Sequence, residues 1–561
     1  MLSAHYITYI IFGIAALLFL ILFNYFDKRK KKQQILKDLK ENWGKVKTDF
    51  INFDKASWYA TYVKDHTFHV LSPQTMADID FDQLFAKIDR TSSKIGQQFL
   101  YNKLAKPTNN HEALKKIKDQ SSFFTANQSI REKIQAELIK LNSNDSYAVV
   151  LLLNDQLVEK PSWFKWLSID LIILAILLIL SIKISVCLIL ALLLITFNAT
   201  YLNYWNKRHL LIFTKSLSQL NMLIEVSRKL VKEKLPFEVE RIKNAIPVFK
   251  KFQSRIRILY LDFSRNNQGD LSQIPLYLFE IIKAAFLIEI FTFFKLIKLI
   301  ENSQEEILNL YKYVGGVDMA ISVASLKASE NTCEPQFSQA YKGVEFKGIK
   351  HPLIENCIDN TLKLDGKSML ITGSNMSGKS TFLRTIAINS LVAQTIYTCF
   401  AEEYKAPFFR LYTSIRIDDN LFQGKSYFLE EVDVMSSLIN AVESKDQNLF
   451  ILDEVFKGTN TVERIAAAKA ILSHLNRKQN LAFVATHDVE LSNLLEEEYA
   501  LYHFTETITN DELIFDHRLK KGPLKTKNAI KILEMSNYPK ELILEAFRIS
   551  KDLSTKDSLH P

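Results

Sequence analysis

The stretch Met369–Ile386, MLITGSNMSGKSTFLRTI, decides how the rest of this chain is interpreted. Its first four residues are apolar and typical of a β-strand, residues 373–380 read Gly-Ser-Asn-Met-Ser-Gly-Lys-Ser, and a helical apolar pattern follows. Strand, G-x-x-x-x-G-K-[ST] loop and helix in this order are the context of a phosphate-binding loop. We therefore predict a site for a nucleoside triphosphate and Mg²⁺, and the alternative is a chance Gly/Ser turn.

Each residue type in this loop suits phosphate chemistry. Gly373 and Gly378 allow backbone angles that a Cβ would forbid, so consecutive N–H groups can point at phosphate oxygens. The helix that follows adds its positive N-terminal end. Lys379 supplies a charge for the β- and γ-phosphates, and the Ser380 hydroxyl is a ligand for Mg²⁺. The predicted ATP-binding residues are Gly373, Ser374, Asn375, Met376, Ser377, Gly378, Lys379, Ser380 and Thr381.

Two later apolar runs, residues 448–454 and 481–487, read as buried parallel strands with polar ends. Asp453 is predicted to hold the Mg²⁺ shell, and Glu454 to orient and deprotonate the attacking water. His487 is predicted to reach the γ-phosphate, with a surface histidine as the alternative. Strands that alternate with helices predict an α/β domain whose parallel sheet binds its ligand at the carboxyl ends of the strands.

Length and composition limit the number of domains and the class of protein. A chain of 561 residues is too long for one core, so several domains are expected. Hydrophobic residues make up 48% and charged residues 24%, which are ordinary globular values, so any membrane content must be local. The net charge of +9 fits nucleic acid or an anionic membrane surface. The cysteines lack paired spacing, so no zinc site or disulfide framework is expected; they are Cys187, Cys333, Cys357 and Cys399.

Two regions are apolar enough to suggest membrane spans. Residues 6–26 are almost purely apolar and are followed by a basic run at 28–32, which predicts an uncleaved anchor with the N-terminus outside and the rest cytoplasmic. A cleaved signal peptide is the alternative. Residues 163–204 predict a helical hairpin with aromatic residues at its outer edges, and a buried hairpin is the alternative. Asp170 and Lys183 are the polar exceptions inside it.

Helices are predicted around these spans. Residues 81–124 show helical apolar faces interrupted at Pro107, and residues 206–263 read as charged lever-type helix. The apolar region 276–300 is interrupted by five charged residues, so we expect a buried or membrane-facing amphipathic helix there.

The motifs together resemble those of the MutS family of mismatch-repair ATPases. Asn375-Met376 inside the phosphate loop is a family trait, and His351-Pro352 and Asn360 match family segments that precede it. Residues 426–431 look like the family's Ser-Thr-Phe-Met signature region with Tyr for Thr, and 485–487 match its Ala-Thr-His switch.

Further segments extend the resemblance to roughly residues 80–150 and 205–550. Asp453-Glu454 with residues 458–461 looks like Asp-Glu followed by Gly-Thr-Ser-Thr, with Asn460 in place of Ser. The stretch from Phe515 is similar to the family's closing helix-turn-helix dimerisation segment, and residues 88–96 look like the start of its core and lever. The N-terminal mismatch-reading domain has no counterpart, because the anchor and a linker occupy its place.

The resemblance implies a membrane-anchored homodimeric ATPase that uses ATP and Mg²⁺ and binds DNA, in mismatch repair or a related DNA transaction. In the family each ATP lies between two subunits, and Ser426 is the residue expected to cap the partner's nucleotide. The expected site is an inner, cytoplasmic membrane with several spans and the ATPase domain in the cytoplasm. The alternatives are a nucleotide-switched membrane scaffold that does not touch DNA and an ABC-type transporter subunit, although no Leu-Ser-Gly-Gly-Gln-like signature occurs.

The predicted fold class is mixed: three transmembrane helices, an all-α lever/core domain, and a C-terminal α/β P-loop (ABC-type) ATPase domain that ends in a helix-turn-helix segment. The domains are expected to follow one another as an anchor at 1–27, a basic linker at 28–79, helical core and lever at 80–162, the hairpin at 163–204, more lever at 205–340, the ATPase at 341–510 and the dimerisation segment at 511–561.

Overall fold

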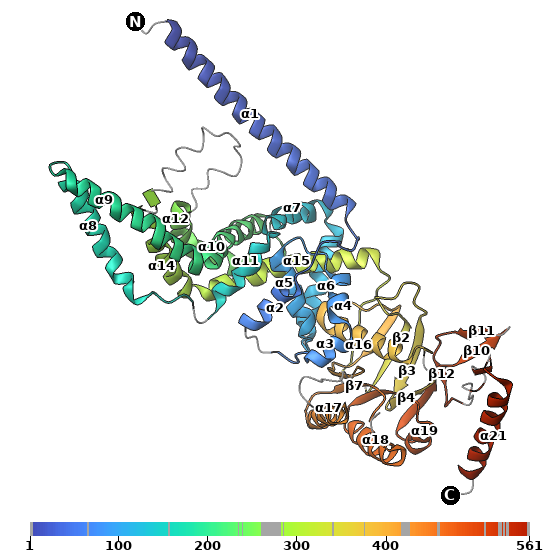
Figure 1. Cartoon of the computed structure of the whole chain (residues 1–561). Helices are drawn as coiled ribbons and strands as arrows, with labels where there is room; N and C mark the ends of the chain where they lie inside the picture. Colours follow the sequence, from blue (N-terminus) through green and yellow to red (C-terminus); the bar gives the residue numbers. More distant parts are fainter. Residues whose placement is uncertain are drawn as a thin grey trace. The chain divides into compact units, whose positions relative to one another are not determined.

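The computed structural model describes residues 4–63, 67–154, 157–233, 235–237, 239–259, 282–283, 285–338, 342–374, 376–416, 427–456, 460–509, 512–524, 530, 533–534 and 538–557. They form two compact units, whose elements are labelled in Figure 1. The first unit comprises Met1–Asp65, Ile88–Asn102 and Asp119–Ser329. The second comprises His66–Lys87, Lys103–Lys118 and Glu330–Pro561.

The first unit is helical. Its long elements are α1 (Ala4–Glu41), α10 (Asn203–Lys232) and α15 (Gln304–Ser329). Shorter helices surround them: α2 (Phe53–Tyr62), α5 (Lys94–Ala105), α6 (His111–Ala126), α7 (Gln128–Leu138), η1 (Ile139–Leu141), η2 (Asn144–Leu153), η3 (Ser162–Lys165), α8 (Trp166–Leu180), α9 (Ser185–Phe197), η4 (Asn198–Leu202), α11 (Val239–Ala245), η5 (Ile246–Phe249), α12 (Lys250–Leu259) and α14 (Ile288–Glu301). α5 and α6 continue past the boundary of this unit.

The core of this unit is built around α15, which is buried along most of its length. Small residues let α5 approach it closely: an added Cβ on Gly96 would lie 2.1 Å from the Asp318 Oδ2 atom. The Asp318 carboxylate accepts hydrogen bonds from the Ser92 and Ser93 N–H groups, at 2.8 Å each. A side chain of α15 therefore holds the two residues that precede α5, and the Ser93 hydroxyl caps the helix by accepting a hydrogen bond from the Gly96 N–H group at 2.9 Å.

The second unit contains three sheets. Its main sheet has the order β12-β9-β4-β8-β7-β6, and all neighbours are parallel except β12, which is antiparallel to β9. These strands are β4 (Ser368–Thr372), β6 (Arg410–Ser414), β7 (Asn448–Asp453), β8 (Leu481–Thr486), β9 (Tyr499–His503) and β12 (Lys520–Lys521). Every residue of β4 and β8 is buried, which explains their unbroken apolar sequences, and the parallel pairing predicted for these strands is confirmed.

A second sheet has the order β1-β5-β2-β3, and β10 pairs with β11 as a hairpin. The strands are β1 (Gln336–Phe337), β2 (Gly343–Ile349), β3 (Asn360–Asp365), β5 (Glu403–Ala406), β10 (Glu506–Thr509) and β11 (Glu512–Phe515). The helices of the unit are α3 (Pro73–Asp78), α4 (Phe81–Ile88), α16 (Lys379–Ile396), α17 (Tyr427–Ala441), α18 (Thr461–Leu475), α19 (Val489–Leu495) and α21 (Lys540–Asp557). Much of the predicted turn before α21 lies outside the described residues.

The prediction of three transmembrane helices is wrong. In the described part of the chain one helical run, Ser162–Leu180, is long and apolar enough to cross a bilayer. The second arm of the hairpin is shorter: its apolar helical part is Ser185–Thr200, which falls short of the roughly 20 residues that a span needs, and the helix then continues through the π-helix η4 into the more polar α10. Most of the predicted first span lies outside the residues whose side chains are described.

Candidate functional site: a nucleotide pocket

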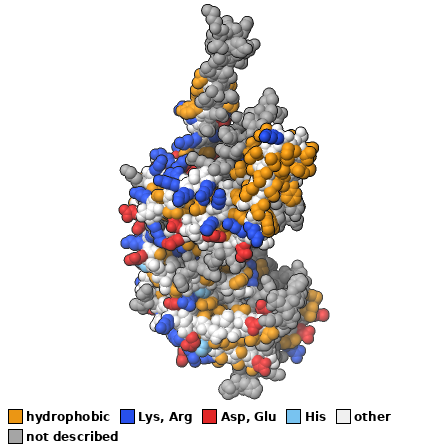
Figure 2. Space-filling view, turned by 90° about the vertical axis from the view of Figure 1, so that its left-hand side faces the viewer, with side chains coloured by type: hydrophobic (Ala, Val, Ile, Leu, Met, Phe, Trp, Pro, Cys, Tyr) orange, Lys and Arg blue, Asp and Glu red, His pale blue; other side chains and the backbone are white. Residues whose placement is uncertain are grey.

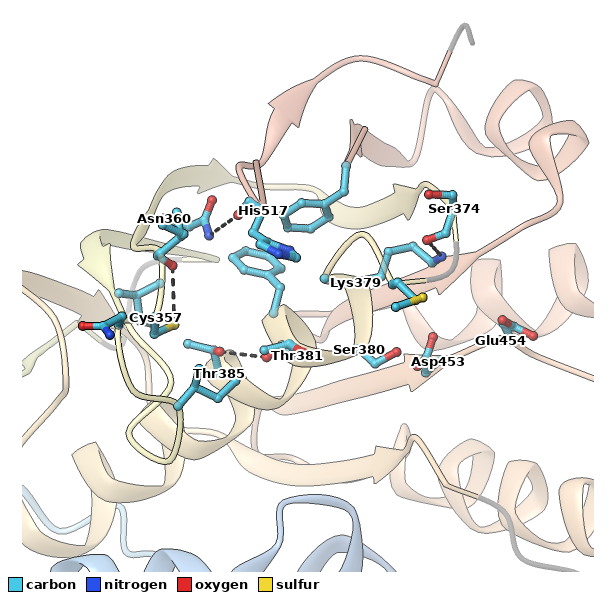
Figure 3. Close-up of a pocket in the computed structure, with 18 residues that line it drawn as sticks. Cys357, Asn360, Ser374, Lys379, Ser380, Thr381, Thr385, Asp453, Glu454 and His517 are labelled. Carbon is cyan, nitrogen blue, oxygen red and sulfur yellow. Dashed lines mark hydrogen bonds between the residues drawn. The ribbon is translucent and has the colours of Figure 1, made fainter. Parts of the chain in front are cut away.

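The phosphate-binding loop lies where three parallel strands end. In the sheet register Thr372 of β4 pairs with Thr486 of β8, and Asp453 of β7 pairs with Ala485. The next residue of each strand therefore leaves the sheet at the same edge. This register brings together segments that are far apart in the sequence: Lys379, Asp453 and Glu454 line one pocket (Figure 3), and His487 lies 3.3 Å from Lys379.

The backbone of the loop has the conformation that its glycines suggest. Gly373 has φ +153° and Gly378 has φ +111°, both in a region that side chains disfavour. A Cβ on Gly373 would lie 2.7 Å from the carbonyl oxygen of Phe504, so this position has no room for a side chain. Met376 also has a positive φ, of +69°, and its side chain is exposed. Asn375 lies outside the described residues.

Lys379 begins α16, and its side chain is buried across the loop. The Nζ atom donates hydrogen bonds to the carbonyl oxygens of Gly373, at 2.7 Å, and Ser374, at 3.0 Å. It also lies 3.3 Å from Nε2 of His487. The ammonium group is thus held at the centre of the loop, at the end of α16 where the helix dipole is positive, so both favour an anion there.

The predicted base Glu454 lies beside the predicted switch histidine. The Oε1 atom of Glu454 is 3.1 Å from Nε2 of His487, and the Glu454 N–H group donates to the Ala485 carbonyl at 2.9 Å. Glu454 has φ +59°, an uncommon conformation for a residue with a side chain. Strained backbone of this kind is concentrated at functional sites, where surrounding contacts maintain it.

The residues predicted to bind Mg²⁺ line the same pocket. The Ser380 and Asp453 side chains lie next to each other in Figure 3, with Glu454 beyond them. Among the described residues there is no group of three or more His, Cys, Asp and Glu side chains that could hold a metal ion by themselves. One hydroxyl and one carboxylate fit Mg²⁺ that takes its remaining ligands from phosphates and water, as it does in many nucleotide sites.

The other half of the pocket is apolar, and the whole pocket has a volume of about 400 Å³. Its walls include Ile349, Ile358, Phe382 and Phe504, and the two phenylalanine rings lie 5.7 Å apart, edge to face. A mostly apolar cleft beside a phosphate loop fits a nucleoside base.

His517 closes this half of the pocket. Its Nδ1 atom lies 3.1 Å from the Ser377 carbonyl oxygen, so the imidazole is fixed against the loop. The Asn360 side chain holds the same segment, since Nδ2 donates to the His517 carbonyl at 3.2 Å and Oδ1 accepts from the Leu519 N–H group at 2.8 Å. Sequence reasoning missed His517 and Phe504, because no local pattern shows that residues 504–519 return to the loop.

Three polar side chains near the pocket, those of His351, Ser374 and Ser377, make hydrogen bonds within the protein. Burial, reinforced by Arg384, lowers the pKa of His351 to about 4, so this imidazole is neutral at physiological pH. Its Nδ1 atom accepts a hydrogen bond from the Leu353 N–H group at 3.3 Å. The Ser374 hydroxyl donates to Glu506 at 2.6 Å, and the Ser377 hydroxyl donates to the Ser374 carbonyl at 2.8 Å.

Of the remaining predicted residues, one lines the pocket and the others lie outside the described residues. Thr381 lines the pocket on the first turn of α16. Ser426, the predicted trans-acting residue, and residues 457–459 lie outside the described residues.

A strand, a glycine-containing phosphate loop and a helix, with acidic and histidine residues at the adjacent strand ends, define a P-loop nucleotide-binding domain. Residues 369–554 match the family model of MutS domain V. The DNA mismatch repair protein MutS of Listeria monocytogenes serotype 4a is 30% identical over 275 residues, which cover 46% of this chain and 31% of that protein. Its counterpart in Petrotoga mobilis is 33% identical over 267 residues, covering 46% of this chain and 32% of that protein.

The corresponding protein of Thermus thermophilus is 30% identical over 234 residues, which cover 41% of this chain and 28% of the relative. The matched region spans about a third of the length of these curated relatives. The second unit therefore contains a region similar to domain V of MutS proteins.

Proposed function

We propose that this chain binds ATP with Mg²⁺ and hydrolyses it, as a MutS-type ATPase. The observation that carries the proposal is the convergence on one loop of Lys379, Glu454 and His487, with 3.3 Å between the lysine and the histidine and 3.1 Å between the histidine and the glutamate. Nothing in the helical unit is needed for this step, so the chemistry is assigned to the second unit.

Each side chain has a separate role in the proposed reaction. Lys379 binds the β- and γ-phosphates and exchanges its loop carbonyl contacts for phosphate oxygens. Ser380 and Asp453 hold Mg²⁺, which neutralises developing charge on the phosphates. Glu454 orients the attacking water and accepts its proton. His487, between Glu454 and Lys379, contacts the γ-phosphate. The nucleoside base of ATP stacks in the apolar half of the pocket, against Phe504 and His517.

Substitution of Glu454 tests the proposal directly. Glu454→Gln keeps the shape of the side chain but removes the base, so we expect turnover to fall at least a hundredfold while ATP binding remains. Glu497→Gln, at an exposed position of the same unit, is the matched control and should keep wild-type turnover. The measurements are phosphate release and equilibrium binding of a fluorescent ATP analogue. Undiminished hydrolysis by Glu454→Gln would refute the assignment of the base.

We propose further that the chain acts as a homodimer on DNA, as in the relatives that are named DNA mismatch repair proteins. Ser426 is proposed to cap the ATP of the partner subunit. Binding of matched and mismatched duplexes by the purified full chain, over a range of salt concentrations, tests the DNA part. Binding that weakens steeply with salt supports phosphate contacts. Absence of binding at low salt would favour the alternative, a nucleotide-switched scaffold that does not touch DNA.

A specific surface favours a second proposal, association of the first unit with a lipid bilayer. α8 and α9 expose apolar side chains on several sides, including Ile172, Ile176 and Ile179 of α8, which are 58%, 50% and 68% exposed. Figure 2 shows this face as a broad hydrophobic patch. Monomeric soluble proteins rarely expose such patches. The Asp170 carboxylate is satisfied by the Asn198 side chain at 2.9 Å, which keeps this polar pair on the inner side of the hairpin.

Flotation of the full chain with neutral phosphatidylcholine vesicles tests this association. The wild type should float with the vesicles, and Ile172→Asp with Ile176→Asp should abolish flotation. Lys243→Asp with Lys250→Asp, at exposed positions of the same unit, is the control and should still float. A wild-type chain that stays at the bottom of the gradient would refute bilayer association.

A further inference from the structure

A second pocket lies at the base of the α8–α9 hairpin, entirely within the first unit. Its volume is about 290 Å³, close to the lower limit of about 300 Å³ for small-molecule sites. Three parts of the chain form it: the segment that leads into η3, α12, and one face of α14. We refer to it as the α12–α14 pocket.

The charge of this pocket is one-sided. Lys160, Arg255, Lys295 and Lys298 line it, and no Asp or Glu does. In the part of the chain that the structure describes, none of the four is within ion-pair distance of a carboxylate. Four cations without a counter-charge repel one another, and an anion among them would lower the electrostatic energy.

The floor of the pocket is aromatic and well packed. The Phe164 ring lies 4.8 Å from the ring of Phe294 and 5.3 Å from that of Phe291, both edge to face. The Nζ atom of Lys160 lies 5.3 Å from the centre of the Phe164 ring. These contacts fix the entry of the hairpin onto α14, so three exposed lysines and the half-buried Arg255 surround a packed aromatic floor.

The apolar surface of α8 beside the pocket favours an anion that carries an apolar group. Phe164 is separated by one residue from Trp166, which begins α8 and is 60% exposed. The apolar patch of α8 therefore starts at the edge of a cationic cavity, and in Figure 2 blue side chains border the hydrophobic patch. A ligand that satisfies both surfaces is amphipathic, with an anionic head and an apolar tail. The backbone of a nucleic acid would satisfy the cations but would lie along an exposed hydrophobic surface.

We propose that the α12–α14 pocket binds the phosphate headgroup of an anionic phospholipid, with the acyl chains along the exposed side of α8. This site rests on the bilayer association proposed above and adds a lipid preference to it. Lys295 and Lys298, one helical turn apart on α14, provide the charge that the headgroup meets, and Phe164, Phe291 and Phe294 support the glycerol region.

The test compares flotation of the full chain with neutral phosphatidylcholine vesicles and with vesicles that contain 30% phosphatidylglycerol. We expect the wild type to partition more strongly into the anionic vesicles. Lys295→Gln with Lys298→Gln should reduce partition into the anionic vesicles by about thirtyfold, because each basic residue near an anionic surface contributes about fivefold. Partition into the neutral vesicles should be unchanged. Lys243→Gln with Lys250→Gln removes the same charge at exposed positions that do not line the pocket, and should have little effect.

Each outcome of the vesicle experiment either supports or refutes the headgroup site. Equal partition of the wild type into both vesicles would overturn the headgroup site but leave bilayer association intact, whereas absence of flotation with either vesicle would overturn both. Equal losses in the two lysine pairs would show general attraction to the surface and refute a specific pocket. Added inorganic phosphate at millimolar concentration should not displace the chain, and displacement would indicate a site for free phosphate. Loss of duplex DNA binding by the pocket variant, with lipid preference unchanged, would assign the pocket to nucleic acid instead.

Discussion

Two adjacent glycines of α15 should respond in opposite ways to the same substitution. A Cβ on Gly315 would lie 2.7 Å from Cβ and 2.8 Å from Cγ of Phe99, atoms at the base of that side chain that cannot rotate away. A Cβ on Gly316 would lie 3.9 Å from the nearest Phe99 atom, an ordinary contact. Alanine is favoured over glycine inside a helix by about 1 kcal/mol, whereas an overpacked contact as close as that of Gly315 costs about 2–3 kcal/mol, the upper part of the usual range. We therefore expect Gly315→Ala to destabilise the α5–α15 contact by about 1–2 kcal/mol, and Gly316→Ala to stabilise it by up to about 1 kcal/mol.

Hydrogen–deuterium exchange of peptides from α5 and α15 measures this difference locally, without an assumption that the whole chain unfolds in one step. Gly315→Ala should speed exchange in both helices by about five- to thirtyfold, and Gly316→Ala should slow it. Peptides from the second unit provide the internal control, because neither substitution touches that unit. If both variants exchange alike, the reasoning from the Phe99 contact is wrong.

Three further predictions concern the pocket and the helical core. Gly378→Ala places a side chain at φ +111° and 3.2 Å from the His517 ring, so affinity for a fluorescent ATP analogue should fall at least tenfold. Asn360→Ala releases the segment that carries His517 and should weaken the same binding by about tenfold, with little change in thermal stability. Burial raises the pKa of Asp318 to about 6 despite the hydrogen bonds from Ser92 and Ser93. The folded unit therefore binds more protons than the unfolded chain between about pH 4 and 6, and its free energy of unfolding should fall by about 3 kcal/mol as pH rises through that range; Asp318→Asn should lose this slope.

The sequence predicts which residues meet in the phosphate-loop half of the site, because each pattern that predicts them lies within a few neighbouring residues. Loop, helix start and strand ends are each encoded within a few residues, and parallel pairing of the buried strands brings Asp453, Glu454 and His487 to one edge. The base-binding half is different. His517 reaches the loop only after the chain has passed through β9, β10 and β11, and such long-range returns depend on packing that no short pattern records.

The prediction of three transmembrane helices failed for a related reason. Hydropathy integrates over a window, whereas the length of a span depends on where the helix starts and ends. The turn between α8 and α9 lies where the sequence predicts it, but the apolar helical part of the second arm, Ser185–Thr200, is shorter than a span. Asn198 lies near the end of this apolar part, where its side chain donates hydrogen bonds to the Asp170 carboxylate and the Ala285 carbonyl oxygen.

The least predictable feature is the inclusion of residues 66–87 in the second unit. The buried Asp78 carboxylate at the end of α3 accepts hydrogen bonds from the Thr413 hydroxyl at 2.6 Å and the Arg416 N–H group at 2.8 Å. Its carbonyl oxygen accepts from Nε of Arg384 at 2.9 Å, on the helix that begins at the phosphate loop. The end of β6 and the phosphate-loop helix are therefore both fastened to α3. Because α4 follows α3 after two residues and the chain enters the helical unit at Ile88, these hydrogen bonds attach the nucleotide site to a segment of chain that leads directly into that unit.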